Sequence, residues 1–316
     1  MDMIDTSAPR KTFAYPALKM INRTHLFSRL SEDEIVANYR RCYGVGEEIG
    51  IDEIRKHAAV EGQLTDELLA SPKYERPETF SRAYTELYAK LPWLKTAGTQ
   101  SGAENWIKLM RPGSTVFEIG SGSGYIINAL ARAGFKCVGT DIASGRVEVA
   151  RQKNGVTWEN TDGVHLTQFT EAGAYDYVLS NQVVEHLHPD DIVTHFTEAR
   201  KLLKPGGEYL MITPYAPLGP KDVSLVFGLK RPVFMHLREY YLNELIEIAK
   251  EAEFKEVMCV FTQSKLGICR PSRSFTIYSS LMDRLLRHWN FVAGPTGKTL
   301  AKALQIKGNI FLRLSN

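Results

Sequence analysis

The 316-residue sequence predicts an α/β protein with a doubly wound, mostly parallel sheet. Two observations predict this class. From residue 114 onward, short apolar runs alternate with helix-length amphipathic stretches, as in βαβ units. A glycine-rich turn at residues 120–124 follows the first apolar run, where a strand would pass into a helix. No strand-like alternation precedes residue 115, so we expect the chain before it to be helical.

The N-terminal part carries helix signals. Ser31 and Glu34 have the spacing of a capping box ahead of an apolar stripe. Further on, Phe80, Tyr84 and Tyr88 recur at helical spacing. We interpret these aromatic residues as core or lid packing, because the first 100 residues carry no surplus of basic side chains that would accompany a nucleic-acid platform.

The remaining elements follow in order. Strands are expected at residues 115–119, 135–140, 156–159, 175–180, 208–213, 255–262 and 309–314. Helices are expected at residues 125–132, 144–151, 190–203, 237–252 and 278–289. Pro205-Gly206-Gly207 supplies the residues that end a helix and turn the chain into the next strand.

This order predicts two regions. Residues 1–110 form a helical region that serves as a lid, in substrate binding or in dimerisation. Residues 111–316 form the sheet domain, with a helical insertion at about 264–307 before the last strand. A homodimer is left open.

Composition narrows the class of protein. The chain is 44% hydrophobic and 24% charged, which excludes a disordered or collagen-like protein. Its four cysteines form no C-x-x-C pair, so a reduced, intracellular protein is expected. Asp2 and Asp5 stand where a secretory signal would be basic and then apolar, and no apolar run reaches the ~18 residues of a membrane span. We expect a cytoplasmic protein.

Charge is distributed unevenly. The net charge is +3, but residues 264–316 hold nine Lys and Arg against one Asp, which leaves −5 for the rest of the chain. A basic segment favours an anionic acceptor that carries phosphate or carboxylate. The alternatives are a solvated basic face and peripheral membrane contact of the amphipathic helix at 278–289.

The glycine turn and the acidic residues that follow two of the strands carry the functional argument. The glycines run G-x-G-x-G, whereas a dinucleotide fingerprint would need glycine at position 125, which is Tyr125. Asp141 follows the second strand about 20 residues later, where a carboxylate can accept both hydroxyls of a ribose. Asp162 and Gly163 follow the third strand, where they could accept the adenine amino group and leave room for the ring. Ligands bind at this edge of such sheets.

These features resemble the class I S-adenosylmethionine-dependent methyltransferases that act on small molecules. Five segments carry the resemblance in the family's order: 118–124, Asp141, Asp162-Gly163, 175–187 and 202–207. The resemblance implies a sheet of seven strands whose last strand runs antiparallel, with S-adenosylmethionine as the cofactor. It also implies a cofactor-binding set that comprises Glu118, Gly120, Ser121, Gly122, Gly124, Asp141, Ile142, Asp162, Gly163, Asn181 and Gln182.

Within that set the resemblance implies separate roles. Gly120 and Gly122 would pass the methionine portion of the cofactor, Glu118 would orient its ammonium group through water, and the Asn181 backbone would line the methyl-donor side. The reaction would be an in-line displacement, which needs alignment and exclusion of water more than side-chain chemistry. The expected acceptor is a small molecule or a glycan or lipid precursor, methylated at oxygen.

The catalytic candidates are His186, with Glu185 beside it, and His236. An imidazole can take a proton from a hydroxyl near neutral pH, and the alternative is that His186 only packs in the turn. Some magnesium-dependent members of the family carry E-x-x-E-H at this place. Here Gln182 replaces the first carboxylate, so no metal is expected.

The substrate candidates are Tyr215, Arg231 and His236, in or just after a proline- and glycine-rich loop that leaves the fifth strand. Two other functions stay open beside small-molecule methylation. An RNA methyltransferase is favoured by the basic C-terminal part but lacks a recognised RNA-binding module, so a nucleic-acid partner is not expected. A non-catalytic scaffold would not require the glycine turn and the acids together.

Overall fold

A computed structural model describes residues 23, 25–95, 102–143, 155–263, 267–288 and 308–316. Its central element is a mixed sheet whose order is β3-β2-β1-β4-β5-β8-β6-β7. The strands of this sheet are β1 (Thr115–Ile119), β2 (Lys136–Asp141), β3 (Val156–Asn160), β4 (Tyr175–Asn181), β5 (Leu203–Pro214), β6 (Glu256–Gln263), β7 (Ile268–Pro271) and β8 (Asn309–Ser315).

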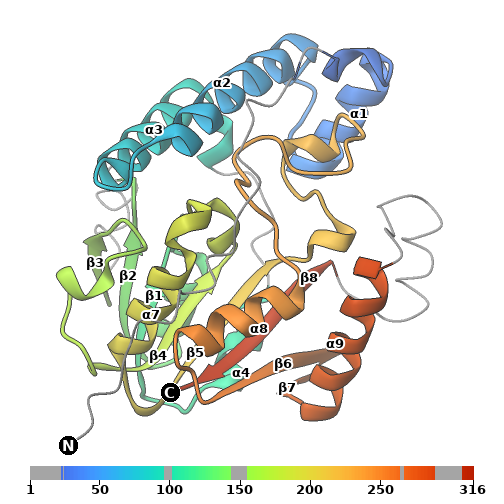
Figure 1. The fold of residues 1–316 in the computed structure, drawn as a ribbon. Helices are drawn as coiled ribbons and strands as arrows, with labels where there is room; N and C mark the ends of the chain where they lie inside the picture. Colours follow the sequence, from blue (N-terminus) through green and yellow to red (C-terminus); the bar gives the residue numbers. More distant parts are fainter. Residues whose placement is uncertain (1–22, 24, 96–101, 144–154, 264–266, 289–307) are drawn as a thin grey trace, which may run out of the picture.

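The first five strands pair in parallel, as the sequence predicts. β8 runs antiparallel between β5 and β6, in agreement with the expectation for the last strand. Because β2 and β4 both pair in parallel with β1, the carboxyl ends of these three strands lie together at one edge of the sheet (Figure 1).

Helices cover both faces of the sheet, so the expected α/β class is confirmed. On one face, apolar side chains of α4 (Ala103–Leu109) and α5 (Tyr125–Arg132) pack on β1 and its neighbours. On the other face, α7 (Ile192–Leu202) and α8 (Leu242–Glu251) bury their apolar stripes. Asp283 of α9 (Arg273–His288) accepts the backbone N–H groups of Leu242 and Asn243, which fixes α9 to the start of α8.

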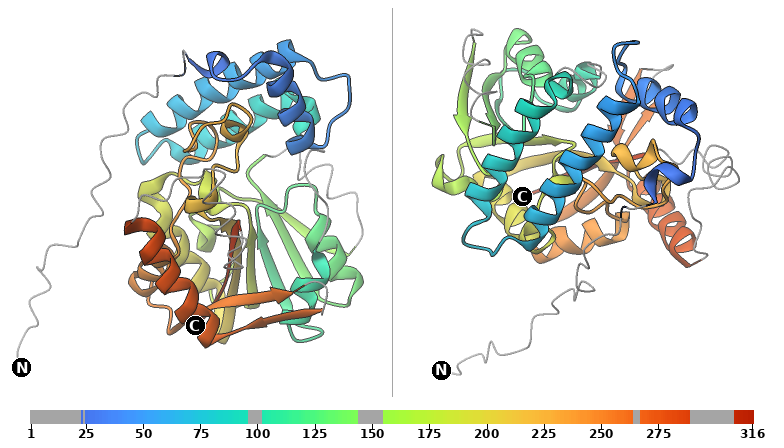
Figure 2. Two further views of the ribbon diagram at one scale, coloured as in Figure 1. Left: turned by 90° about the vertical axis from the view of Figure 1, so that its right-hand side faces the viewer. Right: turned by 90° about the horizontal axis from the view of Figure 1, so that it is seen from above.

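A helical layer lies across the carboxyl edge of the sheet (Figures 1 and 2). It consists of α1 (Glu32–Tyr43), α2 (Ile51–Ala70) and α3 (Arg76–Lys90). These helices pack on the loop after β5 through Phe227, Phe234 and Met235. The Arg76 guanidinium, which is mostly buried, lies 2.8 Å from Asp191 at the start of α7 and ties this layer to the sheet domain.

Short 3-10 helices complete the described part of the chain. They are η1 (Leu26–Ser28), η2 (Pro92–Lys95), η3 (Leu166–Gln168), η4 (Val184–His186), η5 (Pro189–Asp191), η6 (Ala216–Leu218) and η7 (Val223–Leu225). None of the helices in the described ranges is both long and apolar enough to cross a membrane.

One additional strand and the starts of three elements differ from the sequence prediction. The described sheet has eight strands instead of seven, because residues 268–271, expected in a helical insertion, pair with β6 as β7. β5 begins at Leu203, so the glycines expected to form a turn lie within it, and Gly206 adopts a positive φ of 73°. α8 begins only at Leu242, because Glu244 accepts the N–H of Tyr241 and caps the helix there. α9 begins at Arg273, five residues before the predicted start.

Three predicted segments lie partly or wholly outside the described residues. They are the helix at 144–151, the end of the helix at 278–289, and most of the insertion beyond residue 288. Within the described part of the N-terminal region the expected helices are present.

Candidate active site

The glycine turn joins β1 to α5 and needs glycine for two physical reasons. Gly120, Gly122 and Gly124 all have positive φ, at 65°, 54° and 75°, a conformation that side-chain-bearing residues rarely adopt. A Cβ at Gly120 would stand 2.7 Å from Val183, and one at Gly124 would stand 2.8 Å from the Trp158 ring. The spacing that the sequence analysis singled out is therefore required by the local packing.

Asp141 joins the end of β2 to this turn. Its Oδ2 accepts the backbone N–H of Gly122 at 2.9 Å, and its Oδ1 accepts that of Ala143 at 3.0 Å. The carboxylate also lines a cavity at the strand ends, the place where the sequence analysis expects the ribose hydroxyls of the cofactor.

Asp162 and Gly163 lie on the same cavity wall. Asp162 Oδ1 accepts the N–H groups of Val164 and His165, both at 2.8 Å, so much of this carboxylate serves its own turn. The Gly163 carbonyl accepts a hydrogen bond from buried His195 at 2.6 Å. Burial lowers the pKa of His195 to about 4, so its ring is neutral.

Glu118 lies behind the turn and does not line the cavity. It is only 2% exposed, and burial raises its pKa to about 7. Its Oε2 has no hydrogen-bond partner among the described residues. An acceptor that is buried and unpaired here fits the expected contact, through water, with the cofactor's ammonium group.

The cavity has a volume of about 400 Å³, within the usual range for small-molecule sites. Its sheet side includes six residues of the expected cofactor set: Gly120, Asp141, Ile142, Asp162, Gly163 and Gln182. Ser121, Gly122, Gly124 and Asn181 lie outside this lining. A glycine turn at the end of β1, a carboxylate at the end of β2 and a buried acid with one unpartnered oxygen are features that an adenosyl amino-acid cofactor requires, so these residues fit it.

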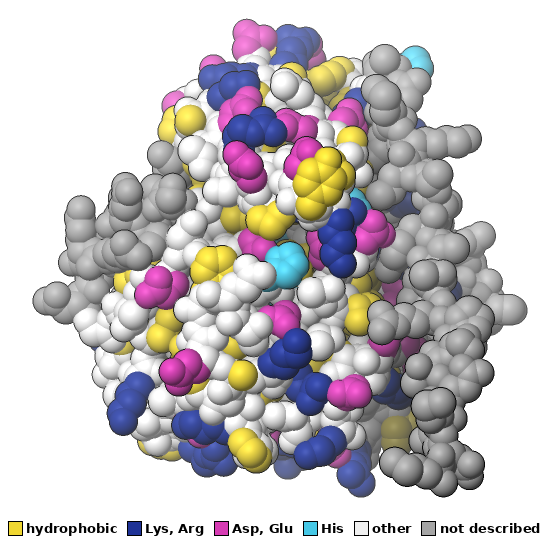
Figure 3. Space-filling view, turned by 60° about the vertical axis from the view of Figure 1, so that its left-hand side comes forward, with side chains coloured by type: hydrophobic (Ala, Val, Ile, Leu, Met, Phe, Trp, Pro, Cys, Tyr) yellow, Lys and Arg dark blue, Asp and Glu magenta, His cyan; other side chains and the backbone are white. Residues whose placement is uncertain are grey.

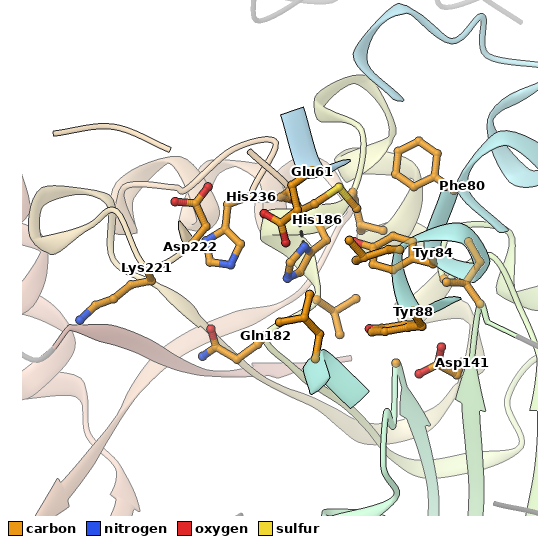
Figure 4. Close-up of a pocket in the computed structure, with 18 of the residues that line it drawn as sticks. Glu61, Phe80, Tyr84, Tyr88, Asp141, Gln182, His186, Lys221, Asp222 and His236 are labelled. Atoms are coloured by element: carbon orange, nitrogen blue, oxygen red, sulfur yellow. Dashed lines mark hydrogen bonds between the residues drawn. The ribbon is translucent and has the colours of Figure 1, made fainter. Parts of the chain in front are cut away.

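His186 and His236 face each other at the far end of the cavity, with ring centroids 4.7 Å apart (Figure 4). His186 Nδ1 lies 2.9 Å from the Met235 carbonyl and donates to it, which leaves Nε2 as an acceptor. Burial, together with the neighbouring His236, lowers the pKa of His186 to about 3. The ring is therefore neutral at physiological pH.

His236, unlike His186, is positively charged at physiological pH. Burial disfavours its charged form, but Glu239 at 2.9 Å and the carboxylates of Asp222 and Glu185 raise its pKa to about 9. Glu185 is fully buried, accepts a hydrogen bond from Thr213 at 3.0 Å, and has a pKa raised to about 7 by burial. The three predicted catalytic residues thus lie together.

This cluster raises the question of a metal, because one ligand atom each of Glu185, His186 and His236 lie within 4.8 Å of one another. Two imidazoles and one carboxylate do not fit Mg²⁺, which prefers oxygen ligands. Gln182, which lines the cavity, offers only a neutral amide in place of a fourth, charged ligand. The expectation that no metal is used stays a prediction.

Two predicted substrate contacts do not reach this cavity. Tyr215 is buried and donates to Asp283 of α9 at 2.9 Å, so the end of β5 turns this side chain toward α9. Arg231 is exposed and does not belong to the cavity lining, because the loop after β5 turns its apolar side chains toward α1 and α2 instead. Of the three, only His236 is in place.

The sequence analysis missed most of the opposite wall. Helices α1 to α3 contribute Cys42, Tyr43, Glu61, Phe80, Tyr84, Leu87 and Tyr88 to the cavity. Phe80, Tyr84 and Tyr88 were recognised as a stripe; they pack in one hydrophobic cluster and also line the cavity, so core and lid packing both stay open. The sequence does contain a signal for Glu61, because His57 precedes it by four residues and both side chains therefore lie on the same face of α2.

Comparisons with known proteins agree with this geometry. Residues 116–207 match the model of a family described as "Methyltransferase domain". A "Ubiquinone biosynthesis O-methyltransferase" of Cereibacter sphaeroides is 35% identical over 118 residues, which are 36% of this chain and 45% of the relative. One of the same name from Paramagnetospirillum magneticum is 38% identical over 109 residues, 33% of this chain and 43% of that protein. The chain thus spans less than half the length of the curated relatives it matches.

Among solved structures, the Burkholderia thailandensis 1,6-didemethyltoxoflavin-N1-methyltransferase is 16% identical, with a TM-score of 0.49 and coverage of 78% of this chain and 91% of that one. The matched family model and the relatives define the class of domain: residues 116–207 are a methyltransferase domain. S-adenosylmethionine is the cofactor of this domain.

Proposed function

We propose that the protein transfers a methyl group from S-adenosylmethionine to an oxygen atom of a small-molecule acceptor. The observation that carries the proposal is one cavity bounded by Gly120 and Asp141 at one end and by His186 and His236 at the other. The curated relatives, which are named O-methyltransferases, support oxygen as the methylated atom.

The cofactor would supply an activated methyl group on sulfur, so the protein's own residues need only position and deprotonate the acceptor. The cofactor-binding residues would be those of the turn and strand ends described above. Tyr84 and Tyr88 of α3 line the cavity and would help to exclude water from the bound reactants.

His186 Nε2 would accept the hydrogen bond of the acceptor hydroxyl and aim an oxygen lone pair at the methyl group. A pKa of about 3 makes His186 a weak base, but a weak base is sufficient to take the proton of a hydroxyl that is being methylated. As the new O–C bond forms, the hydroxyl becomes a far stronger acid than imidazolium, and its proton passes to Nε2. Positioning comes first, and proton transfer is late.

Incubation of the protein with S-adenosylmethionine labelled at its methyl group and with fractionated cell extract tests the proposal. We expect a labelled small-molecule ether, identified by mass. Label on RNA would favour the nucleic-acid alternative. If no label is transferred by a folded protein that binds the cofactor, the scaffold alternative is favoured instead.

A further inference from the structure

The acceptor end of the cavity contains a buried carboxylate that the proposed reaction does not use. Glu61 of α2 is 6% exposed, lines the cavity and points toward the two histidines (Figure 4). Within the described part of the chain its Oε2 has no hydrogen-bond partner. Burial of an unpaired carboxylate oxygen is costly, so its retention here calls for a partner that arrives with a ligand.

A chain of contacts leads from Trp93 to the other carboxylate oxygen of Glu61. Trp93 Nε1 donates to Tyr39 Oη at 2.9 Å, and Tyr39 Oη lies 2.7 Å from His57 Nδ1. His57 Nε2 lies 2.8 Å from Glu61 Oε1. With the Tyr39 hydroxyl donating to Nδ1, the ring proton of His57 lies on Nε2, on the side of the carboxylate, although Nε2 and Oε1 are not aligned as a hydrogen bond. Glu61 keeps Oε2 as an acceptor toward the cavity.

The charges around Glu61 also disfavour an anionic ligand group at this end of the cavity. Asp222 also lines the cavity, and burial raises its pKa to about 6, with Glu61 as one of the contributing charges. Glu185 and Glu239 lie beside His236. Acidic groups thus outnumber the two cationic side chains at this end, His236 and Lys221, and a carboxylate or phosphate placed against Glu61 would meet a like charge.

We propose that Glu61 recognises the methyl acceptor, and that the acceptor presents a hydrogen-bond donor, a hydroxyl or amine group, to Glu61 Oε2. This inference rests on the proposed function. It replaces, for this end of the cavity, the anionic acceptor that the basic C-terminal part suggested. Figure 3 shows basic and acidic side chains interspersed over one face of the molecule.

The test uses calorimetry on the full chain saturated with S-adenosylhomocysteine. The probes are phenol and benzylamine, which carry donors, and benzoate, which carries none. For the wild-type chain we expect the donor probes to bind at least about tenfold more tightly than benzoate, the effect of one charge-assisted hydrogen bond.

The decisive variant is E61Q. Because His57 presents an N–H, the amide oxygen of Gln should turn to His57 and its NH₂ group to the cavity, which reverses the polarity of the site. Donor probes should weaken about tenfold and benzoate should gain, with no change in affinity for S-adenosylhomocysteine. E67Q, on the same helix but paired with Arg82 outside the cavity, is the matched control and should behave as wild type.

Y39F provides a second variant that leaves the cavity lining intact. It removes the hydroxyl that orients His57, so it should lower the affinity for the donor probes. In the E61Q background it should cause little further loss of affinity. Three results would overturn the inference: benzoate and the donor probes bind equally well, E61Q binds the probes as the wild type does, or no donor probe binds to the chain saturated with S-adenosylhomocysteine. Failure of S-adenosylhomocysteine itself to bind would instead overturn the proposed function.

Discussion

Asp141 shows how one side chain can serve both the fold and the ligand. It accepts N–H groups from Gly122 and Ala143 and still lines the cavity. Its place at the end of β2 made it predictable from sequence, because the carboxyl ends of parallel strands meet at one edge. The backbone contacts that fix its orientation were not predictable, since they depend on the φ values of the glycine turn.

Replacement of Asp141 by Asn tests this dual role. D141N loses one charged acceptor, so we expect its affinity for S-adenosylhomocysteine to fall about tenfold to a hundredfold, as for a charge-assisted hydrogen bond. Calorimetry measures the change. D33N, at an exposed position of α1, should bind as the wild type does. Unchanged binding by D141N would remove Asp141 from the cofactor site.

His186 is the residue through which the proposed chemistry can be separated from cofactor binding. H186A removes the Nε2 acceptor, so kcat with the acceptor identified by labelling should fall about 10²-fold. Affinity for S-adenosylhomocysteine should stay at the wild-type value. H25A, which removes an exposed histidine, is the control. A kcat equal to that of the wild type would show that His186 only packs in the turn.

At the scale of elements, Asp176 at the start of β4 connects three strands. Its Oδ2 accepts the N–H and hydroxyl of Thr115 on β1 and lies 3.0 Å from Lys204 Nζ on β5. Partial burial alone would raise its pKa, but the hydrogen bonds from Thr115 and Lys204 outweigh burial and lower the pKa to about 2.

This shift makes stability depend on pH in a defined direction. A carboxyl whose folded pKa lies below its unfolded value of about 4 stabilises the fold above that pH and loses its contribution as the pH falls toward 2. D176N should therefore lower the free energy of unfolding by about 2 kcal/mol at pH 7. The difference from wild type should shrink below pH 4, as measured by urea denaturation. A difference that is constant with pH would contradict this account.

The strands differ in how well the sequence predicts them. β1 to β5 were predicted because each is a short apolar run between turn residues. β7 was not, because Ile268–Pro271 is too short to show a period and forms a strand only against the edge of β6. Tyr215 was expected at the substrate, but its hydrogen bond to Asp283 depends on where α9 packs.

At the scale of the whole molecule, the site is shared between two parts of the chain. The sheet edge supplies the residues that sequence motifs reveal, and α1 to α3 supply the opposite wall (Figure 2). Glu61 and Asp141 lie 80 positions apart in the sequence and belong to different elements, so no spacing rule joins them. That half of the site depends on how the helical layer docks, which only the structure shows.

The central claim is that this shared cavity binds S-adenosylmethionine. Titration of the 316-residue chain with S-adenosylhomocysteine, followed by calorimetry, tests it most directly. We predict saturable binding at one site per chain. The absence of binding heat at several temperatures, from a protein whose circular dichroism shows an intact α/β fold, would contradict the account.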